Sequence, residues 1–387
     1  MERDEPTYKL KLTRRRALLG AAAVGVAAAC GPAAAPSPSP VASAGGSAAA
    51  ATATPKGPPE KIRVAFGVAL GNSSNNFAWI GKELGYFAEE NIDPEIISTS
   101  GNIIEADGML ASNQLEVGIF GLDPILRAVI AGSAFPAKSV YNVQSKAQYE
   151  LFTVGNSPIT KVEDLKGKKA AVAAIGSTPE PYLRKALEEK GLKLDDVSQV
   201  ATGAGIPMGE ALKRGDADFG ISTRGQIGPV EQAGTYNLKF LPRPVFFDSI
   251  IAGNVVARSD LSPAKTQALK GYLRSYTKSI VFVKANPAAG IQATWKMYPD
   301  AKPKTVADDV ALAAAVKTNV AYMAYIDKLE GKYGFMPTDK MQRYVDFLNL
   351  NSPKLGPLTT YFTNEYIDYA NDFDVAKVQD QAKNYKP

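Results

Sequence analysis

Residues 61–97 decide the fold, and they read KIRVAFGVALGNSSNNFAWIGKELGYFAEENIDPEII. The segment 62–68 is rich in β-branched residues and alternates, which predicts a strand. The polar run 71–76 can cap the helix predicted over 77–85, and 93–97 predicts a second strand. A strand, a helix and a second strand of these lengths are typical of a parallel α/β sheet.

The same alternation continues along the chain and then gives way to helices. Further strands are predicted at 117–120, 170–175, 216–221, 238–241 and 250–257. Further helices are predicted at 104–112, from Asp123 as N-cap with Pro124 at N1, and at 181–190, 208–214 and 226–234. Beyond residue 262 the pattern is helical, over 263–286, 288–298, 306–330 and 338–348, with amphipathic patches in 364–386. The sequence therefore predicts an α/β fold with a helical C-terminal part.

Composition narrows the function classes. The chain has 387 residues and a net charge of +5, without histidine and with a single cysteine, Cys30. Ser-His-Asp and Cys-His nucleophile systems, disulfides and thiolate metal sites are thereby excluded. The charges interleave without a basic stripe, so we expect no nucleic-acid partner. Composition favours a binding protein over an enzyme, and we expect no cofactor.

Residues 1–30 have the pattern of an export signal. Arginines at 14–16 precede an apolar run, 17–29, which is shorter than the roughly 20 residues that a membrane-spanning helix needs. The following AAACG of residues 27–31 resembles a bacterial lipoprotein cleavage site, which implies acylation of Cys30. A transmembrane anchor, and a cysteine that lies by chance beside an ordinary cleavage site, are the alternatives. Twin-arginine and Sec export both remain open.

Residues 31–60 consist mostly of Ala, Pro, Ser, Gly and Thr. Such a segment cannot bury enough apolar surface to offset the entropy of ordering it. We therefore expect a flexible linker between the acylated cysteine and the folded part.

Four motifs carry a resemblance to a known family: IGKELGYFAEENI (80–92), MLASNQLEVG (109–118), VEDLKGKKAAV (162–172) and ALKRGDADFG (211–220). In this order they resemble the sulfonate, taurine and thiamin-precursor branch of periplasmic solute-binding proteins. The resemblance covers residues 61 to about 234. It implies a two-lobed periplasmic-binding-protein fold of type II with two hinge crossovers.

We place these crossovers near 152–157 and 246–254. Lobe I then comprises 61–154 and 255–387, and lobe II comprises 155–254. The resemblance also implies an ABC-importer permease as partner, a monomer, and a location on the outer face of the cell membrane.

Most candidate ligand-binding residues follow strand ends, where open α/β sheets bind ligands. They are Asn75, Asn76, Phe77, Leu122, Asp123, Gly176, Ser177, Thr178, Thr223 and Arg224. Tyr141 is added as an aromatic ring that could stack on a flat ligand, and Asp248 as a candidate at the second crossover. Asn75, Asn76, Ser177 and Asp123 could equally be helix caps, and Arg224 a solvated surface charge.

The sequence leaves several chemical classes of ligand possible. A sulfonate or similar organic anion is our first expectation, held by Ser177, Thr178 and Arg224. A thiamin-pyrimidine precursor or flavin, stacked on Phe77 or Tyr141, is the alternative, with nitrate or bicarbonate behind both. Trp79 and Phe219 fit the core better than a ligand site. The rival functions are a structural surface lipoprotein and an enzyme like the fungal pyrimidine synthase, whose active-site histidine and cysteine-rich motif this chain lacks.

Overall fold

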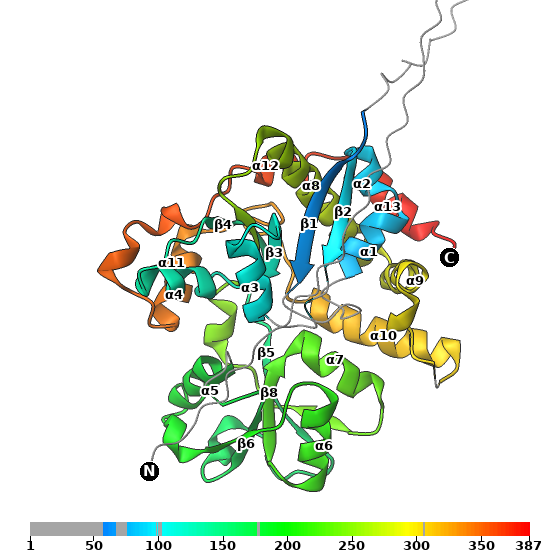
Figure 1. The fold of residues 1–387 in the computed structure, drawn as a ribbon. Helices are drawn as coiled ribbons and strands as arrows, with labels where there is room; N and C mark the ends of the chain where they lie inside the picture. The colour runs from blue at the N-terminus through cyan, green and yellow to red at the C-terminus, as the bar shows by residue number, and fades with distance from the viewer. Residues whose placement is uncertain (1–56, 67–75, 98, 100–102, 176–178, 305) are drawn as a thin grey trace, which may run out of the picture. The chain divides into compact units, whose positions relative to one another are not determined.

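Two β-sheets organise the chain in the computed structural model shown in Figure 1. The structure describes residues 57–66, 76–97, 99, 103–175, 179–304 and 306–387. All of these residues belong to one compact unit.

The first sheet has the strand order β2-β1-β3-β10-β4. Its strands are β1 (Glu60–Phe66), β2 (Ile92–Ile97), β3 (Val117–Phe120), β4 (Ala137–Gln144) and β10 (Ala252–Arg258). β1 pairs in parallel with β2 and β3, whereas β10 runs antiparallel to β3 and β4. The carboxyl ends of β1 to β4 therefore share one edge with the amino end of β10.

The second sheet has the order β7-β6-β8-β5-β9. Its strands are β5 (Tyr149–Val154), β6 (Lys169–Val172), β7 (Ser198–Ala201), β8 (Phe219–Thr223) and β9 (Leu238–Phe240). β6 is parallel to β7 and β8, and β5 is antiparallel to β8 and β9. The carboxyl ends of β6 to β9 therefore share one edge with the amino end of β5.

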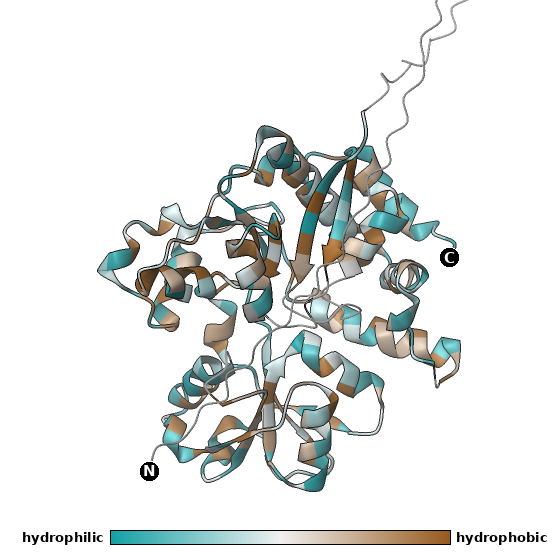
Figure 2. Cartoon of the chain, viewed as in Figure 1, coloured by the Kyte–Doolittle hydropathy of each residue, from teal (hydrophilic) through white to brown (hydrophobic). Residues whose placement is uncertain are grey.

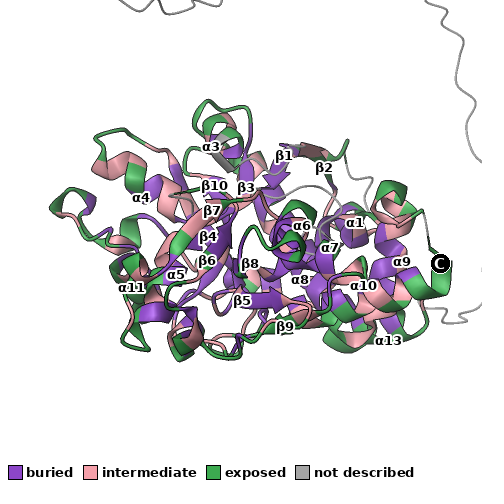
Figure 3. Ribbon diagram, turned by 90° about the horizontal axis from the view of Figure 1, so that it is seen from below, coloured by how far each residue is buried: buried purple, intermediate pink, exposed green. Residues whose placement is uncertain are grey.

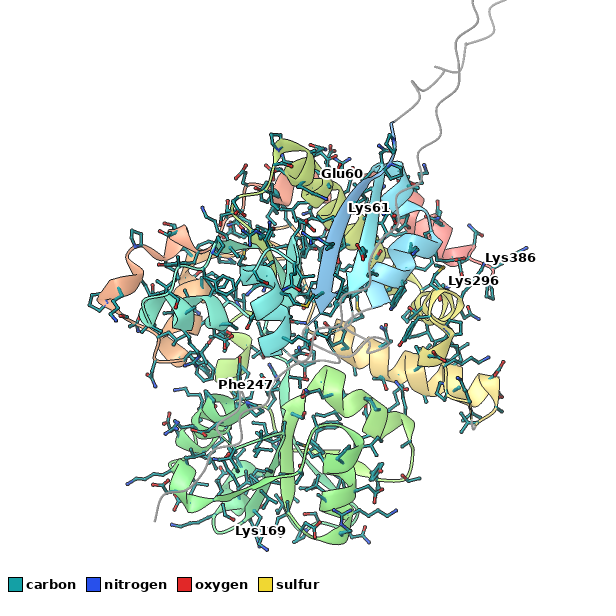
Figure 4. All side chains as sticks on the ribbon, in the orientation of Figure 1. Glu60, Lys61, Lys169, Phe247, Lys296 and Lys386 are labelled. Carbon is teal, nitrogen blue, oxygen red and sulfur yellow. The ribbon has the colours of Figure 1, made fainter. Side chains whose placement is uncertain are left out.

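Two crossovers join these two edges. Residues 145–148 lead from the carboxyl end of β4 to the amino end of β5, and residues 241–251 lead from β9 back to β10. Four intervening residues can span at most about 17 Å, so the two edges are held near each other. Phe247 lies at this junction, whereas Lys169, at the amino end of β6, lies far from it (Figure 4).

Helices cover both faces of each sheet. They are α1 (Asn76–Glu83), α2 (Tyr86–Glu89), α3 (Ile103–Ala111), α4 (Asp123–Ile130), α5 (Pro179–Glu188), α6 (Ile206–Arg214), α7 (Arg224–Gln232), α8 (Pro263–Ala285), α9 (Pro287–Met297), α10 (Asp308–Met323), α11 (Thr338–Phe347), α12 (Ile367–Asn371) and α13 (Val375–Lys383). In the described part of the chain, no helix combines the length and the apolar character that crossing a membrane requires.

Local sequence explains how the long C-terminal helices begin and end. Ser262 caps α8 by accepting a hydrogen bond from the Lys265 N–H at 3.3 Å, and Pro263 occupies the first turn. Asn286 ends α8 and caps α9, because its Oδ1 accepts from the Ala289 N–H at 3.1 Å. The break between the two helices is thus encoded by a single Asn-Pro pair.

Alternating residues place each strand between two cores. Val64 packs into a cluster with Tyr272 and Tyr276 of α8, whereas the next residue, Ala65, faces a cluster on the other side of the sheet. The second cluster continues into the second sheet, where it includes Tyr182 of α5. Figures 2 and 3 show hydrophobic and buried residues along β1 and β3 and hydrophilic, exposed residues on the outer helices.

Most predicted elements are confirmed to within a few residues. Strand 117–120 and helix 263–286 are examples, and the predicted α/β class with a helical C-terminal part is also confirmed. Helix 306–330 is wrong at its end, because α10 stops at Met323 and the chain turns. Asp123 is the first residue of α4, and Leu122 occupies the N-cap position.

The sequence prediction missed three strands, β4, β5 and β7. The expected parallel sheet is also wrong, since each sheet contains one antiparallel strand in its interior. The first crossover was predicted at 152–157, but β5 pairs with β8 and β9, so the chain changes sheet at 145–148. The second change of sheet, at 241–251, overlaps the predicted 246–254. The boundaries of the two lobes as domains stay a prediction.

Candidate functional site

One side chain, Arg243, ties the two crossovers together. It lies on the second crossover and donates from Nη1 to the Tyr149 carbonyl at 2.9 Å and from Nη2 to the Ala147 carbonyl. Its Nε donates to Asp248 Oδ1 at 3.0 Å. The Ala147 N–H donates to the Phe247 carbonyl at 2.9 Å, which adds a backbone link between the crossovers. The junction is therefore cross-linked by charge-assisted hydrogen bonds.

The same arginine faces a carboxylate and a tyrosine. Glu150, the second residue of β5, lies with Oε1 4.0 Å from Arg243 Nη1 and accepts a hydrogen bond from the Tyr325 hydroxyl. The guanidinium also lies over the Tyr325 ring, 5.0 Å from its centroid. Burial, and then the charge of Glu150, raise the pKa of Tyr325, so this phenol stays protonated and remains a donor.

A second acidic group lies at the edge of the first sheet. Asp123 Oδ1 accepts a hydrogen bond from the Tyr344 hydroxyl at 2.9 Å, and burial raises the pKa of the Asp123 carboxyl. Burial, and then the negative charge of Asp123, raise the pKa of Asp107 to about 7. Asp107 Oδ1 is buried and has no hydrogen-bond partner among the described residues. Ionisation of Asp107 is therefore disfavoured both by its burial and by the neighbouring Asp123.

Arg224 is already paired. Its Nη2 lies 2.6 Å from Glu231 Oε2, and the two side chains are 7% and 10% exposed. Its guanidinium also lies over the Phe240 ring, 4.6 Å from the centroid. Thr223 caps α7 by accepting from the Gln226 N–H at 3.4 Å. The predicted anion-binding arginine is thus neutralised by a partner on its own helix.

Three predicted ligand contacts lie in the core. Phe77 is fully buried and packs edge-on against Tyr276, with ring centroids 5.0 Å apart. The Tyr141 hydroxyl is 3.1 Å from Thr277 Oγ1, and its ring meets Tyr276. Leu122 is fully buried. Phe219, expected in the core, is also buried, and Trp79 stacks on Tyr298.

The remaining predicted residues divide into two groups. Asp248 lies on the second crossover, where its side chain is 57% exposed and pairs with Arg243. Asn75, Gly176, Ser177, Thr178 and the acylation candidate Cys30 lie outside the described residues, and the side chain of Asn76 does as well.

Sequence reasoning missed several polar residues at the junction. They are Gln144, Glu150, Arg243, Asn319 and Tyr325. Gln144 and Glu150 fall at the ends of the unpredicted strands β4 and β5. Asn319 lies in the long predicted helix 306–330, where the sequence alone does not show that it is buried. A fully buried asparagine in a helix is unusual.

Among the residues that the structure describes, no three His, Cys, Asp or Glu side chains gather as a metal site would require.

Comparison with protein-family models shows to which family the chain belongs. The model described as "NMT1/THI5 like" matches residues 73–290, which is more than half of the chain. The chain belongs to this family. No curated protein is significantly similar to it in sequence.

Several solved structures are similar to this chain over most of its length. A Candida albicans gene product, described as having the generic periplasmic binding protein fold, is 13% identical with a TM-score of 0.58, over 79% of this chain and 96% of its own. A putative periplasmic sulfonate-binding protein from Methylobacillus flagellatus is 17% identical with a TM-score of 0.54, over 84% and 96%. The desulfurization enzyme DSZB is 15% identical with a TM-score of 0.52, over 81% and 99%. The chain therefore has the periplasmic-binding-protein fold.

Replacing Arg243 by methionine tests the junction. The variant keeps the apolar stem but leaves the carbonyls of Ala147 and Tyr149 without their donor, so we expect a loss of about 2–4 kcal/mol of stability in urea unfolding. Arg214→Met is the control, because Arg214 is exposed and pairs only with exposed Asp216; it should lose less than about 1 kcal/mol. Equal losses in both variants would contradict this role of Arg243.

The raised pKa of Asp107 predicts that its contribution to the free energy of unfolding depends on pH. Its carboxyl titrates near 3.8 in the unfolded chain and at about 7 in the folded protein, so folding takes up a proton between these values. Stability therefore falls as pH rises from about 4 to about 7. With a discount for solvent screening of this half-buried group, Asp107→Asn should be more stable than the wild type by about 1–2 kcal/mol at pH 8 and equal to it at pH 4.

The matched control is Asp195→Asn, which alters an exposed carboxyl. Urea unfolding at both pH values measures the difference. A pH-independent effect of Asp107→Asn would show that burial does not shift this group.

Proposed function

We propose that the chain is an extracytoplasmic solute-binding protein of an ABC importer, which captures a small organic solute between its two sheets. The observation that carries this function is the meeting of the two carboxyl edges. Both crossovers run between these edges, and polar and charged groups from both sheets converge there. Hinged α/β proteins bind ligands at such a junction, and closure around a ligand is typical of this fold.

The first candidate ligand is a sulfonate or similar organic anion. The Gly176-Ser177-Thr178 segment offers a hydroxyl pair before α5, and the Methylobacillus relative is described as sulfonate-binding. The pairing of Arg224 with Glu231 weakens this candidate, since the cation is already neutralised. A thiamin-pyrimidine precursor or flavin is the alternative, which the burial of Phe77 and Tyr141 weakens in turn.

A binding role is favoured over catalysis. DSZB is named as an enzyme and shares the fold, so the fold alone does not decide. The chain has no histidine, and its only cysteine is Cys30, within the predicted leader. Histidine- or cysteine-based nucleophilic chemistry is therefore not available to the folded part.

The proposed setting is the outer face of the cell membrane. Acylation of Cys30 would anchor the chain, residues 31–60 would link it to the folded part, and a membrane permease would receive the solute. A monomer suffices for this role, because one chain supplies both sheets.

A thermal-shift screen of the purified protein tests the function. The probes are taurine, methanesulfonate, aminomethylpyrimidines, riboflavin, nitrate and bicarbonate. A ligand at about one hundred times its Kd adds about 2.7 kcal/mol of stability, which is a clear shift. A flat result with every probe would favour the structural lipoprotein.

Two further variants then test whether Arg224 binds an anionic ligand. Arg224→Gln and Glu231→Gln both break the ion pair, but only the first removes the cation. Binding of an anion through Arg224 should be lost only in Arg224→Gln, so equal affinities in both variants would contradict a role for this arginine.

Cys30→Ser tests the anchor. The variant should bind solute as the wild type does but move from the membrane fraction to the soluble fraction, because the acyl chains can no longer be attached. Fractionation with immunodetection measures this. A variant that stays with the membrane would refute acylation of Cys30 as the anchor.

A further inference from the structure

The buried face of α10 carries polar side chains that have no hydrogen-bond partner in the part of the chain that the structure describes. Asn319 is fully buried, and neither its Oδ1 nor its Nδ2 has a hydrogen-bond partner among the described residues. The Oγ1 of Thr318, which is 1% exposed, is also unpartnered there. Buried amides are nearly always hydrogen-bonded, so an asparagine with both atoms free needs an explanation.

Neighbours on the same helix place Asn319 at the junction of the two sheets. One turn further along α10, the Tyr322 hydroxyl accepts a hydrogen bond from Gln144 Nε2 at 2.7 Å, and Gln144 ends β4 at the carboxyl edge of the first sheet. The preceding residue, Thr318, lies against Gly228 of α7, which follows the second sheet: a Cβ on Gly228 would lie 2.5 Å from Thr318 Cγ2. Figure 1 shows α10 beside α7.

Two more unpartnered groups belong to this neighbourhood. Gln144 is 4% exposed, and its Oε1 has no partner in the described part of the chain. The hydroxyl of fully buried Tyr276 has none either, and its pKa is raised by burial and by nearby Tyr322. We name Gln144, Tyr276, Thr318 and Asn319 the amide cluster. All four are neutral, and no cation or carboxylate belongs to the cluster.

An unsatisfied polar cluster lowers stability, because each group gives up its hydrogen bonds to water on folding. A leucine at position 319 would have nearly the same size without this cost. Proteins keep such costs where function needs the groups. The two free atoms of a carboxamide present a donor and an acceptor side by side.

We propose that the amide cluster is a ligand subsite, in which Asn319 binds a neutral carboxamide or lactam edge of the solute. The N–H of that edge would donate to Asn319 Oδ1, and its carbonyl would accept from Asn319 Nδ2. This assignment rests on the proposed solute-binding function and gives it a substrate class: a molecule with an uncharged amide-like end.

The first test needs no ligand. Asn319→Leu should unfold at the same or a higher urea concentration than the full-length wild type, because it removes unpartnered polar atoms. Asn319→Ala serves as a second variant that avoids any clash, and Val320→Ala, at a half-exposed position on the same helix, is the control. A clearly lower midpoint for both Asn319 variants, with Val320→Ala unchanged, would show that Asn319 is satisfied within the fold and would overturn the subsite.

The second test uses matched amides and acids as probes: nicotinamide against nicotinate, and glutamine against glutamate, with taurine added. We expect an amide member to raise the melting temperature of the wild type, and Asn319→Leu to weaken its Kd at least tenfold. A shift with only the acids or taurine, unaffected by Asn319→Leu, would overturn the amide subsite while the solute-binding function stands. Amide binding that survives in Asn319→Leu would show that the cluster holds only buried water, which also overturns it.

Discussion

The structure depends on one constraint: only four residues, 145–148, separate β4 of the first sheet from β5, the first strand of the second sheet along the chain. A connection of this length fixes which edges of the sheets can meet, and the meeting edges are those with the carboxyl ends of the parallel strands. Arg243, on the returning chain, reinforces the constraint by binding the carbonyls of Ala147, within this connection, and of Tyr149, just after it. Any ligand held by both sheets has to be bound beside this link.

Most charged side chains near the junction form ion pairs with one another, so few of them are free to bind a charged ligand. Arg224 is held by Glu231, and Arg243 by Asp248 and Glu150. Asp123 lies close enough to Asp107 for its negative charge to raise the pKa of the Asp107 carboxyl. Paired charges contribute orientation more than free attraction. Apart from Asp107, the buried side-chain atoms without partners in this part of the described chain belong to neutral residues, among them Gln144, Thr318 and Asn319. The proposed recognition of a solute there would therefore depend on hydrogen-bond geometry.

The fold could be predicted from the sequence where patterns were local. Caps such as Ser262 with Pro263 and the alternation of β1 marked their elements clearly. β4 was missed because Ser139, Asn142 and Gln144 are buried polar residues, which break the expected alternation of apolar and polar side chains. The partner of Arg224, seven residues away on α7, and the isolation of Asn319 depend on tertiary packing, which no spacing reveals. The strand-end rule pointed to the edges where the two crossovers run, but not to the polar residues that the structure brings together there.

The position of β10 has a consequence for how the chain folds. This strand lies between β3 and β4, yet it is made only after the whole second sheet. The second sheet is built from one continuous stretch of chain, whereas the first sheet is complete only when β10 pairs between β3 and β4. Because contacts between distant segments form slowly, we expect this closure to come late, and until then the edges of β3 and β4 are unpaired. Export of an already folded chain would avoid exposing these edges outside the cell, and export of an unfolded chain would require protection from aggregation after translocation.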